Sequence, residues 1–292
     1  MPIVRLQVFL FVALGSLAGA QVKVAVLHPL LADLVGKVGG ERVEVVDLMG
    51  PGGDPHKFEP GAKELRQAQG AQLYFVCGKG LEPYLPKLRD AAGAQKVIEV
   101  GETLPTLKAE VLCDHDGHAH THEEIDPHWW HSIDGWRRAA TRVRKELSAI
   151  DGDNADFYRK RASQVRKELA GLRQWASAEL AKVPPESRTL ATAHAAFAYF
   201  CNEHKWKMLA VQGLNRERID SPKFLAEVVD AIREEKVRAL FPEKRSNPKI
   251  LKTVAEGAGV LVGKPLIADG GSSFEEMFRS NVGVLVVTLG QK

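Results

Sequence analysis

The sequence predicts an α/β fold of two β/α lobes with mostly parallel sheets, joined by one long rigid helix. Short β-branched runs alternate with helical patterns in the first part of the chain, and the same alternation returns after residue 185. A polar segment without proline separates the two regions. The length of 292 residues also exceeds the roughly 100 to 200 residues of a typical single domain. Strands and helices that alternate in this way favour parallel sheets.

The elements of each lobe follow from short apolar runs and from the helical patterns between them. In the first lobe we expect strands at residues 22–27, 43–48 and 72–76, with helices near 30–38, 62–69 and 81–91. In the second lobe we expect strands at 188–193, 207–211, 237–241 and 259–262, with helices at 195–203, 222–235, 248–257 and 274–287.

The segment from about residue 153 to 182 predicts a single long helix. Its apolar or long side chains recur at three- and four-residue steps, which places them along one stripe. Thirty residues would make a rod of roughly 45 Å, enough to run along both lobes. Packing of this stripe against the protein's own lobes is favoured over a coiled-coil partner helix. The stripe consists of Phe157, Val165, Leu169, Leu172, Ala176 and Leu180.

Residues 1–20 are typical of a secretory signal peptide. Arg5 supplies the positive charge, residues 8–14 are apolar, and Ala18-Gly19-Ala20 is a small-residue cleavage site. We therefore expect a mature chain that starts at Gln21, and a soluble periplasmic protein. No cysteine follows the cleavage point, so we expect no lipid anchor, and no other stretch approaches the about 20 apolar residues that span a bilayer. The predicted boundaries are 1–20 for the signal peptide, 21–152 for the N-terminal lobe, 153–182 for the linking helix and 183–292 for the C-terminal lobe.

Composition excludes some partners. The chain has 40 basic and 37 acidic residues, a formal net charge of +3, which is too balanced to indicate nucleic acid. We expect a monomer. Three cysteines are no disulfide framework. Cys77 is expected to be a small buried residue at a strand end, and Cys113 is left open between metal binding and a disulfide.

Three histidines and one carboxylate are candidate metal ligands. The tripeptide Asp-Pro-His occurs twice and ends at His56 and at His128, each in a proline-containing turn. His194 directly follows a predicted strand, and Asp269 follows an apolar run and precedes two glycines. Ligands of open α/β sheets gather beyond the carboxyl ends of the strands, and neutral imidazole suits zinc. A cleft between the lobes could therefore bring the four together as a metal site.

Each candidate also has an ordinary structural interpretation. A single histidine at a strand end is more often hydrogen-bonded or exposed than a ligand, and Asp-Gly-Gly is a common turn sequence. His131 lies close enough to His128 to compete with it as a ligand. His28 ends a strand and His204 lies near the end of a helix, so both are predicted to be structural.

A histidine-rich stretch at residues 113–124 precedes the second Asp-Pro-His. We predict a solvated, partly disordered loop that captures metal loosely as an accessory to the main site. The accessory histidines are His115, His118, His120 and His122.

Four motifs resemble, in order and spacing, the metal-binding components of zinc and manganese ABC importers. The resemblance covers nearly the whole mature chain. It implies two β/α lobes joined by a long rigid helix, with metal held in the interlobe cleft by His56, His128, His194 and Asp269. It also implies delivery to a membrane permease that a cytoplasmic ATPase drives. The motifs are Asp54-Pro-His-Lys-Phe-Glu-Pro60, Asp126-Pro-His-Trp-Trp130, Ala193-His-Ala-Ala-Phe-Ala-Tyr-Phe200 and Phe241-Pro-Glu-Lys-Arg-Ser-Asn-Pro-Lys249.

Within this family, the resemblance favours Zn²⁺ over Mn²⁺ as the cargo. Manganese members usually carry Glu at the position that matches His194, and a histidine-rich loop is typical of zinc members. The chain departs from the family pattern at His131–Asp134, at Ala195 and at Asp269-Gly270. The fourth ligand is accordingly Asp269, a water molecule or another residue.

Two other functions are weaker alternatives. A zinc hydrolase would keep an open coordination position and a nearby general base, but the chain has no His-Glu-x-x-His motif. A secreted zinc buffer or interaction protein would use the histidine-rich loop without a single tight site.

Overall fold

The computed structural model describes residues 21–93, 96–115, 118–214, 222–244 and 247–290. The predicted signal peptide, residues 1–20, lies outside them. Within the described residues, no helix is both long and apolar enough to cross a membrane.

The N-terminal lobe is built on a four-stranded parallel sheet with the strand order β2-β1-β3-β4. The strands are β1 (Val22–Val26), β2 (Val43–Asp47), β3 (Leu73–Val76) and β4 (Val97–Glu99). The helices are α1 (Pro29–Gly39), α2 (Ala62–Gln67) and α3 (Leu85–Ala92). Every residue of β3 is buried, as expected for a strand that is covered on both faces.

The C-terminal lobe repeats this plan with the strand order β10-β9-β7-β8, again all parallel. Its strands are β7 (Thr189–His194), β8 (Lys207–Gln212), β9 (Ala239–Phe241) and β10 (Leu261–Val262). Its helices are α6 (Ala198–His204), α7 (Pro222–Glu234), α8 (Lys249–Ala258) and α9 (Phe274–Leu289). The predicted class of two parallel-sheet lobes is therefore confirmed.

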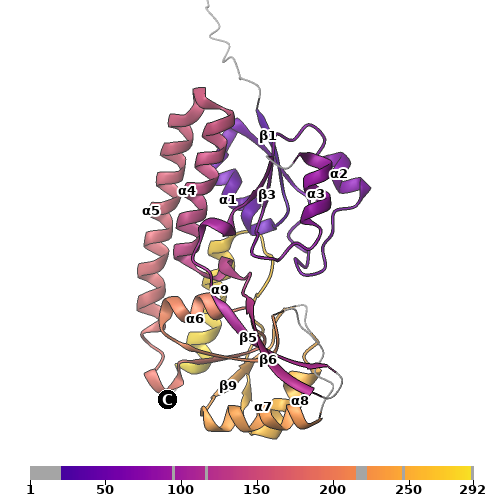
Figure 1. Cartoon of the computed structure of the whole chain (residues 1–292). Coiled ribbons are helices and arrows are strands. Elements are labelled where there is room, and N and C mark those ends of the chain that lie inside the picture. Colours follow the sequence, from indigo (N-terminus) through magenta and orange to yellow (C-terminus); the bar gives the residue numbers. More distant parts are fainter. Residues whose placement is uncertain (1–20, 94–95, 116–117, 215–221, 245–246, 291–292) are drawn as a thin grey trace, which may run out of the picture.

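The predicted long helix is α5 (Ala155–Leu180), which runs beside both lobes (Figure 1). Its buried stripe contains five of the six predicted residues, with Tyr158 fully buried where Phe157 was expected. A second helix, α4 (Ile133–Ile150), packs along it and was not predicted. Ser132 caps the start of α4 by accepting a hydrogen bond from the Gly135 N–H at 2.9 Å.

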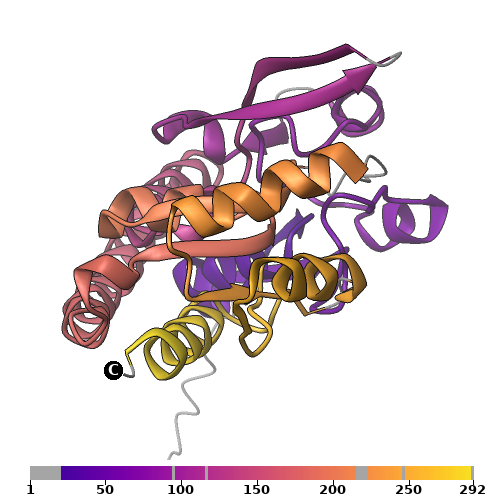
Figure 2. The same cartoon turned by 90° about the horizontal axis from the view of Figure 1, so that it is seen from below.

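The histidine-rich stretch is a β-hairpin, so the prediction of a partly disordered loop is wrong for its backbone. Strands β5 (Lys108–His115) and β6 (His118–Ile125) pair antiparallel, with Cys113 opposite His120. Strand pairing satisfies backbone N–H and C=O groups whatever the side chains are. A polar composition therefore does not exclude paired strands, although it led to the prediction of a loop. Ala109, at the base of the hairpin, packs against the buried cluster of Ala195 and Leu214 in the C-terminal lobe. Figure 2 shows the hairpin along one edge of the molecule.

Cys77 and Cys201 are buried and free, as expected for Cys77. The side chains of Cys113 and of His115, His118, His120 and His122 lie outside the described part, so their predicted roles stay predictions.

Candidate metal centre

His56 lies in the loop that follows β2. The carboxylate of Asp54 accepts a hydrogen bond from the backbone N–H of His56 at 3.1 Å, and the Asp54 carbonyl accepts from the N–H of Phe58 at 3.0 Å. This local turn is one that aspartate favours. The first Asp-Pro-His is therefore a stiff loop that presents the imidazole.

His128 uses its aspartate in two ways. Asp126 Oδ1 accepts a hydrogen bond from the backbone N–H of His128 at 2.8 Å and also lies 2.7 Å from the ring nitrogen Nδ1. Both residues are fully buried. A carboxylate at Nδ1 fixes the proton on that nitrogen and leaves the lone pair of Nε2 for another partner.

His194 is the last residue of β7 and has the same arrangement with Glu243. Its Nδ1 lies 2.5 Å from Glu243 Oε2, and its backbone N–H donates to Glu243 Oε1 at 2.9 Å. Glu243 was quoted in a motif, but its role was not predicted. The sequence places Glu243 just after an expected strand, but only the sheet order, in which β9 neighbours β7, brings it to His194.

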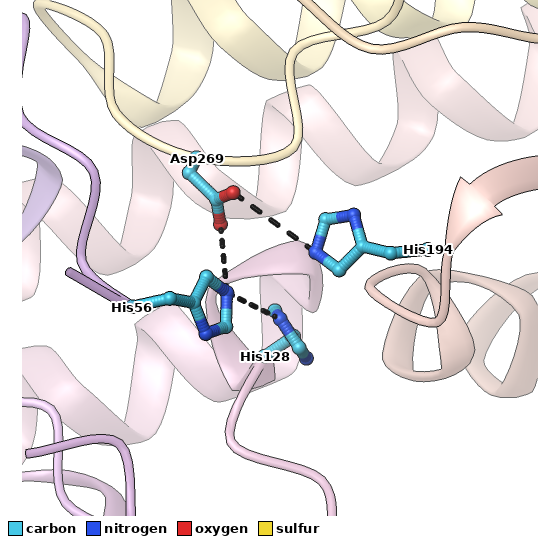
Figure 3. Close-up of side chains that lie close together, drawn as sticks. All are labelled: His56, His128, His194 and Asp269. Atoms are coloured by element: carbon cyan, nitrogen blue, oxygen red, sulfur yellow. Dashed lines mark hydrogen bonds and ion pairs between the residues drawn. The ribbon is translucent and has the colours of Figure 1, made fainter. Parts of the chain in front are cut away.

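Asp269 completes the group from the loop between β10 and α9. Its Oδ1 lies 3.8 Å from His56 Nε2, and its Oδ2 lies 4.0 Å from His194 Nε2. The Nε2 atoms of His56 and His128 are 3.1 Å apart. The donor atoms of the four residues all lie within 4.8 Å of one another, and Figure 3 shows the side chains pointing toward one another.

The surroundings of the site favour neutral His128 and ionised Asp269. Burial lowers the pKa of His128 well below the usual value, and the neighbouring His194 and His56 lower it further. Burial alone would raise the pKa of Asp269, but the contact with His56 and the nearby His194 and His128 outweigh burial and hold that pKa below its ordinary range. A neutral imidazole beside an ionised carboxylate is the protonation state that metal binding needs.

The geometry suits four-coordinate binding. His194 Nε2 is buried and has no hydrogen-bond partner among the described residues, which is costly unless something else binds it. Zinc bound at 2.0 to 2.1 Å by tetrahedral nitrogens would place those nitrogens about 3.3 Å apart. The 3.1 Å between His56 and His128 is close to this value, and the 3.8 and 4.0 Å separations from Asp269 need only a small contraction.

Three further histidines, one expected to compete as a ligand and two expected to be structural, are not among the four donors. His131 directs its Nε2 at the Ala268 carbonyl oxygen, 2.8 Å away. His28 is fully buried with its ring 4.9 Å from that of Trp130, and burial lowers its pKa to about 4. His204 ends α6 between Phe200 and Phe278, where burial lowers its pKa and disfavours the expected cation.

Two lobes on parallel sheets, a long helix beside both and four convergent donors define a two-lobed metal-binding protein. The chain belongs to the ZnuA family, described as zinc-uptake complex component A, periplasmic, whose model matches residues 24–287. This family consists of transport proteins, so the prediction that the chain is not an enzyme is confirmed. Membership makes the chain the solute-binding component of a metal ABC importer, which works with permease and ATPase components.

Individual relatives differ in the metal that their names carry. The manganese-binding lipoprotein MntA of Bacillus subtilis is 31% identical over 288 residues, which cover 94% of this chain and 92% of MntA. The zinc-binding lipoprotein AdcA of Streptococcus pneumoniae is 28% identical over 229 residues, 77% of this chain and 45% of AdcA.

Solved structures show the same fold. The periplasmic zinc-binding protein TroA from Treponema pallidum has a TM-score of 0.81 at 23% identity, covering 93% of this chain and 100% of TroA. A manganese-bound periplasmic metal-binding protein from Candidatus Liberibacter asiaticus has a TM-score of 0.77 at 21% identity, covering 91% of this chain and 99% of that one.

Proposed function

We propose that the protein captures Zn²⁺ in the periplasm at His56, His128, His194 and Asp269 and delivers it to an inner-membrane permease. The observation that carries the proposal is the convergence of three imidazole nitrogens and one carboxylate oxygen within 4.8 Å. Two of the imidazoles are backed by the carboxylates of Asp126 and Glu243, an arrangement typical of histidines that bind zinc.

Zinc is favoured over manganese by the donor set. Three nitrogens and one carboxylate make a small, nitrogen-rich site, whereas Mn²⁺ prefers oxygen donors in a larger coordination shell. Relatives named for manganese and for zinc both resemble the chain, so a competition experiment decides. We expect equimolar Zn²⁺ to displace Mn²⁺ from the protein; tighter binding of Mn²⁺ would reverse the choice of cargo.

Calorimetric titration of the purified protein with Zn²⁺ tests the site itself. We expect one tight site per chain, and its affinity should fall at least a hundredfold when His56, His128 or His194 is replaced by alanine, because each variant removes a ligand. His204→Phe is the matched control, since it removes a buried histidine outside the site.

A variant in which a short Gly-Ser turn replaces residues 113–124 separates this proposal from a zinc buffer. We expect the tight site to survive. Loss of all binding in that variant, with unchanged affinity in the three alanine variants, would instead assign binding to the hairpin.

We also propose that cleavage after Ala20 releases a monomeric, unanchored protein into the periplasm. The charge, apolar run and small residues of positions 1–20 support the cleavage, and Gln21 in place of a cysteine after the cleavage point supports the absence of a lipid anchor. N-terminal sequencing of secreted protein should begin at Gln21, and light scattering should give the mass of one chain. A retained Met1 or a lipid-modified N-terminus would contradict it.

A further inference from the structure

The carbonyl oxygen of Ala268, next to Asp269, accepts two hydrogen bonds from the turn that carries His128. The indole Nε1 of Trp130 donates at 2.9 Å, and Nε2 of His131 lies 2.8 Å away. All three residues are buried. The contacts join segments that are 137 and 138 positions apart in the chain.

Neighbouring aromatic rings and one hydrogen bond hold Trp130 and His131 in place. The ring of Trp130 lies 4.9 Å from that of His28 and 5.0 Å from that of His128. The Trp130 carbonyl accepts a hydrogen bond from the indole of Trp136 at 2.7 Å. The His131 ring packs 4.3 Å from Phe197. The turn therefore presents its two N–H groups in fixed directions.

The residue before Ala268 is fixed from the opposite side by α9. Asn281 is buried on that helix, and its Oδ1 accepts from the Ile267 N–H at 2.8 Å while its Nδ2 donates to the Ile267 carbonyl at 2.8 Å. The two residues that precede Asp269 are thus held from opposite sides: α9 holds Ile267, and the turn with Trp130 and His131 holds Ala268.

We propose that Trp130 and His131 are positioning residues that hold Asp269 beside His128, between the two lobes, through the carbonyl of Ala268. This inference rests on the proposed function, in which Asp269 is a metal ligand. A carbonyl oxygen only accepts hydrogen bonds, so Nε2 of His131 carries a proton and offers no lone pair to an ion. His131 therefore acts through Asp269 and does not compete with His128.

Three single variants test the two donors. His131→Phe keeps a ring against Phe197 but removes the imidazole N–H group. Trp130→Phe likewise keeps an aromatic ring but removes the indole N–H group. We expect each to weaken Zn²⁺ binding by roughly threefold to tenfold, the usual net effect of one hydrogen bond. His131→Gln keeps an N–H donor and should bind more tightly than His131→Phe. His204→Phe, in which another buried histidine is replaced, should bind as the parent does.

A double-mutant cycle shows whether the effect passes through Asp269. In an Asp269→Ala background, which keeps the three imidazoles, His131→Phe should change Zn²⁺ affinity less than twofold. The visible absorption of bound Co²⁺ gives a second measurement, because it responds to the number and placement of ligands. The spectra of His131→Phe and Trp130→Phe should move from that of the parent toward that of Asp269→Ala.

Two outcomes would overturn the inference alone: parental affinity and Co²⁺ spectra in both Phe variants, or an equal loss of affinity with and without Asp269. If His131→Phe does not fold, Trp130→Phe in the two backgrounds decides in the same way. A parent protein that binds no metal would instead overturn the proposed function.

Discussion

At the residue scale, two of the three site histidines each contact a buried carboxylate, Asp126 or Glu243. Glu243 and Asp126 each contact Nδ1 of one imidazole and the backbone N–H of the same residue. Each carboxylate thereby fixes both the ring orientation and the tautomer of its histidine. Burial raises the pKa of Asp126 to about 7, against hydrogen bonding from His128 and attraction to nearby histidines. The environment of these carboxylates is therefore part of the site.

Glu243→Gln should weaken Zn²⁺ binding by about tenfold to a hundredfold, because an amide cannot stabilise the positive charge that develops on a metal-bound imidazole. Calorimetric titration measures this loss. Glu235→Gln, on the exposed Lys207–Glu235 pair, is the matched control and should bind as the parent does. Equal affinities in the two variants would show that Glu243 contributes nothing to the site.

His28 introduces a dependence of stability on pH. Its pKa falls from 6.5 to about 4, first because burial penalises the charged ring and also because His56, His131 and His128 lie near. The unfolded chain therefore binds a proton at His28 at a higher pH than the folded protein does. This contribution destabilises the fold as the pH drops through about 6.5.

His28→Phe keeps a ring against Trp130 and removes that proton. Between pH 7.5 and pH 5, the metal-free variant should gain about 2 kcal/mol in free energy of unfolding relative to the parent. Urea denaturation at both pH values measures this difference. The raised pKa values of Asp126 and Glu82 make the folded protein more stable as the pH falls. These contributions are present in both the variant and the parent, so the comparison cancels them. An equal change in the free energy of unfolding of variant and parent between the two pH values would contradict the prediction.

At the scale of elements, α4 and α5 form the layer that both lobes share. One stripe of α5 is buried from Tyr158 to Leu180, and α4 and α1 pack against it. Aromatic contacts extend the layer to α9, where Phe274 lies 5.1 Å from Trp136 of α4. A helix pair packed on one continuous side is stiffer than a loop connection, so α5 holds the lobes at a defined separation.

Leu172→Ala tests the contribution of this layer. Leu172 is 2% exposed. Truncation of such a leucine to alanine usually lowers the free energy of unfolding by about 2 to 5 kcal/mol, because apolar contacts are lost and a cavity is left. Denaturant unfolding of the metal-free protein measures the loss. Gln174→Ala, at an exposed position of the same helix, should change the free energy of unfolding by less than about 0.5 kcal/mol. A similar effect in both variants would mean that the α5 stripe is not a core.

The sequence predicted the elements whose pattern is strong and local. Short apolar runs located β1, β2 and β7 to within about one residue at each end, because strands of a parallel sheet are rich in apolar side chains. The three-residue strand β4 was too short to give a pattern. Helix α4 was missed although Ile133, Trp136, Val143 and Leu147 recur at helical steps, since its many arginines hid the stripe. Glu243 could not be assigned a role, because its contact with His194 depends on sheet order.

At the scale of the whole molecule, the candidate site lies where the two lobes meet, beside the interlobe hydrogen bonds from Trp130 and His131 to Ala268. His56 follows β2 of one sheet and His194 ends β7 of the other, so the carboxyl ends of the two sheets bring both histidines to one point, where open α/β sheets commonly bind ligands. An ion held there contributes to the stability of both lobes at once.

Removal of metal should therefore lower the melting temperature. Zn²⁺ at a hundred times its Kd should add about 2.7 kcal/mol to the free energy of unfolding if it binds only the folded state. Thermal unfolding with and without a chelator checks this result. The variant without residues 113–124 should keep the full effect, and its loss there would assign the stabilisation to the hairpin.

The burial of the donor side chains, none more than 6% exposed, has a kinetic consequence. Such burial leaves a competing chelator little access to an ion held by these donors, so we expect the ion to leave only after the protein has opened. The rate of zinc loss should then become independent of chelator concentration once the chelator is in excess. We then expect the dwell time of a bound ion to depend on the protein's motion, and a membrane partner that favours the open form to set the moment of release.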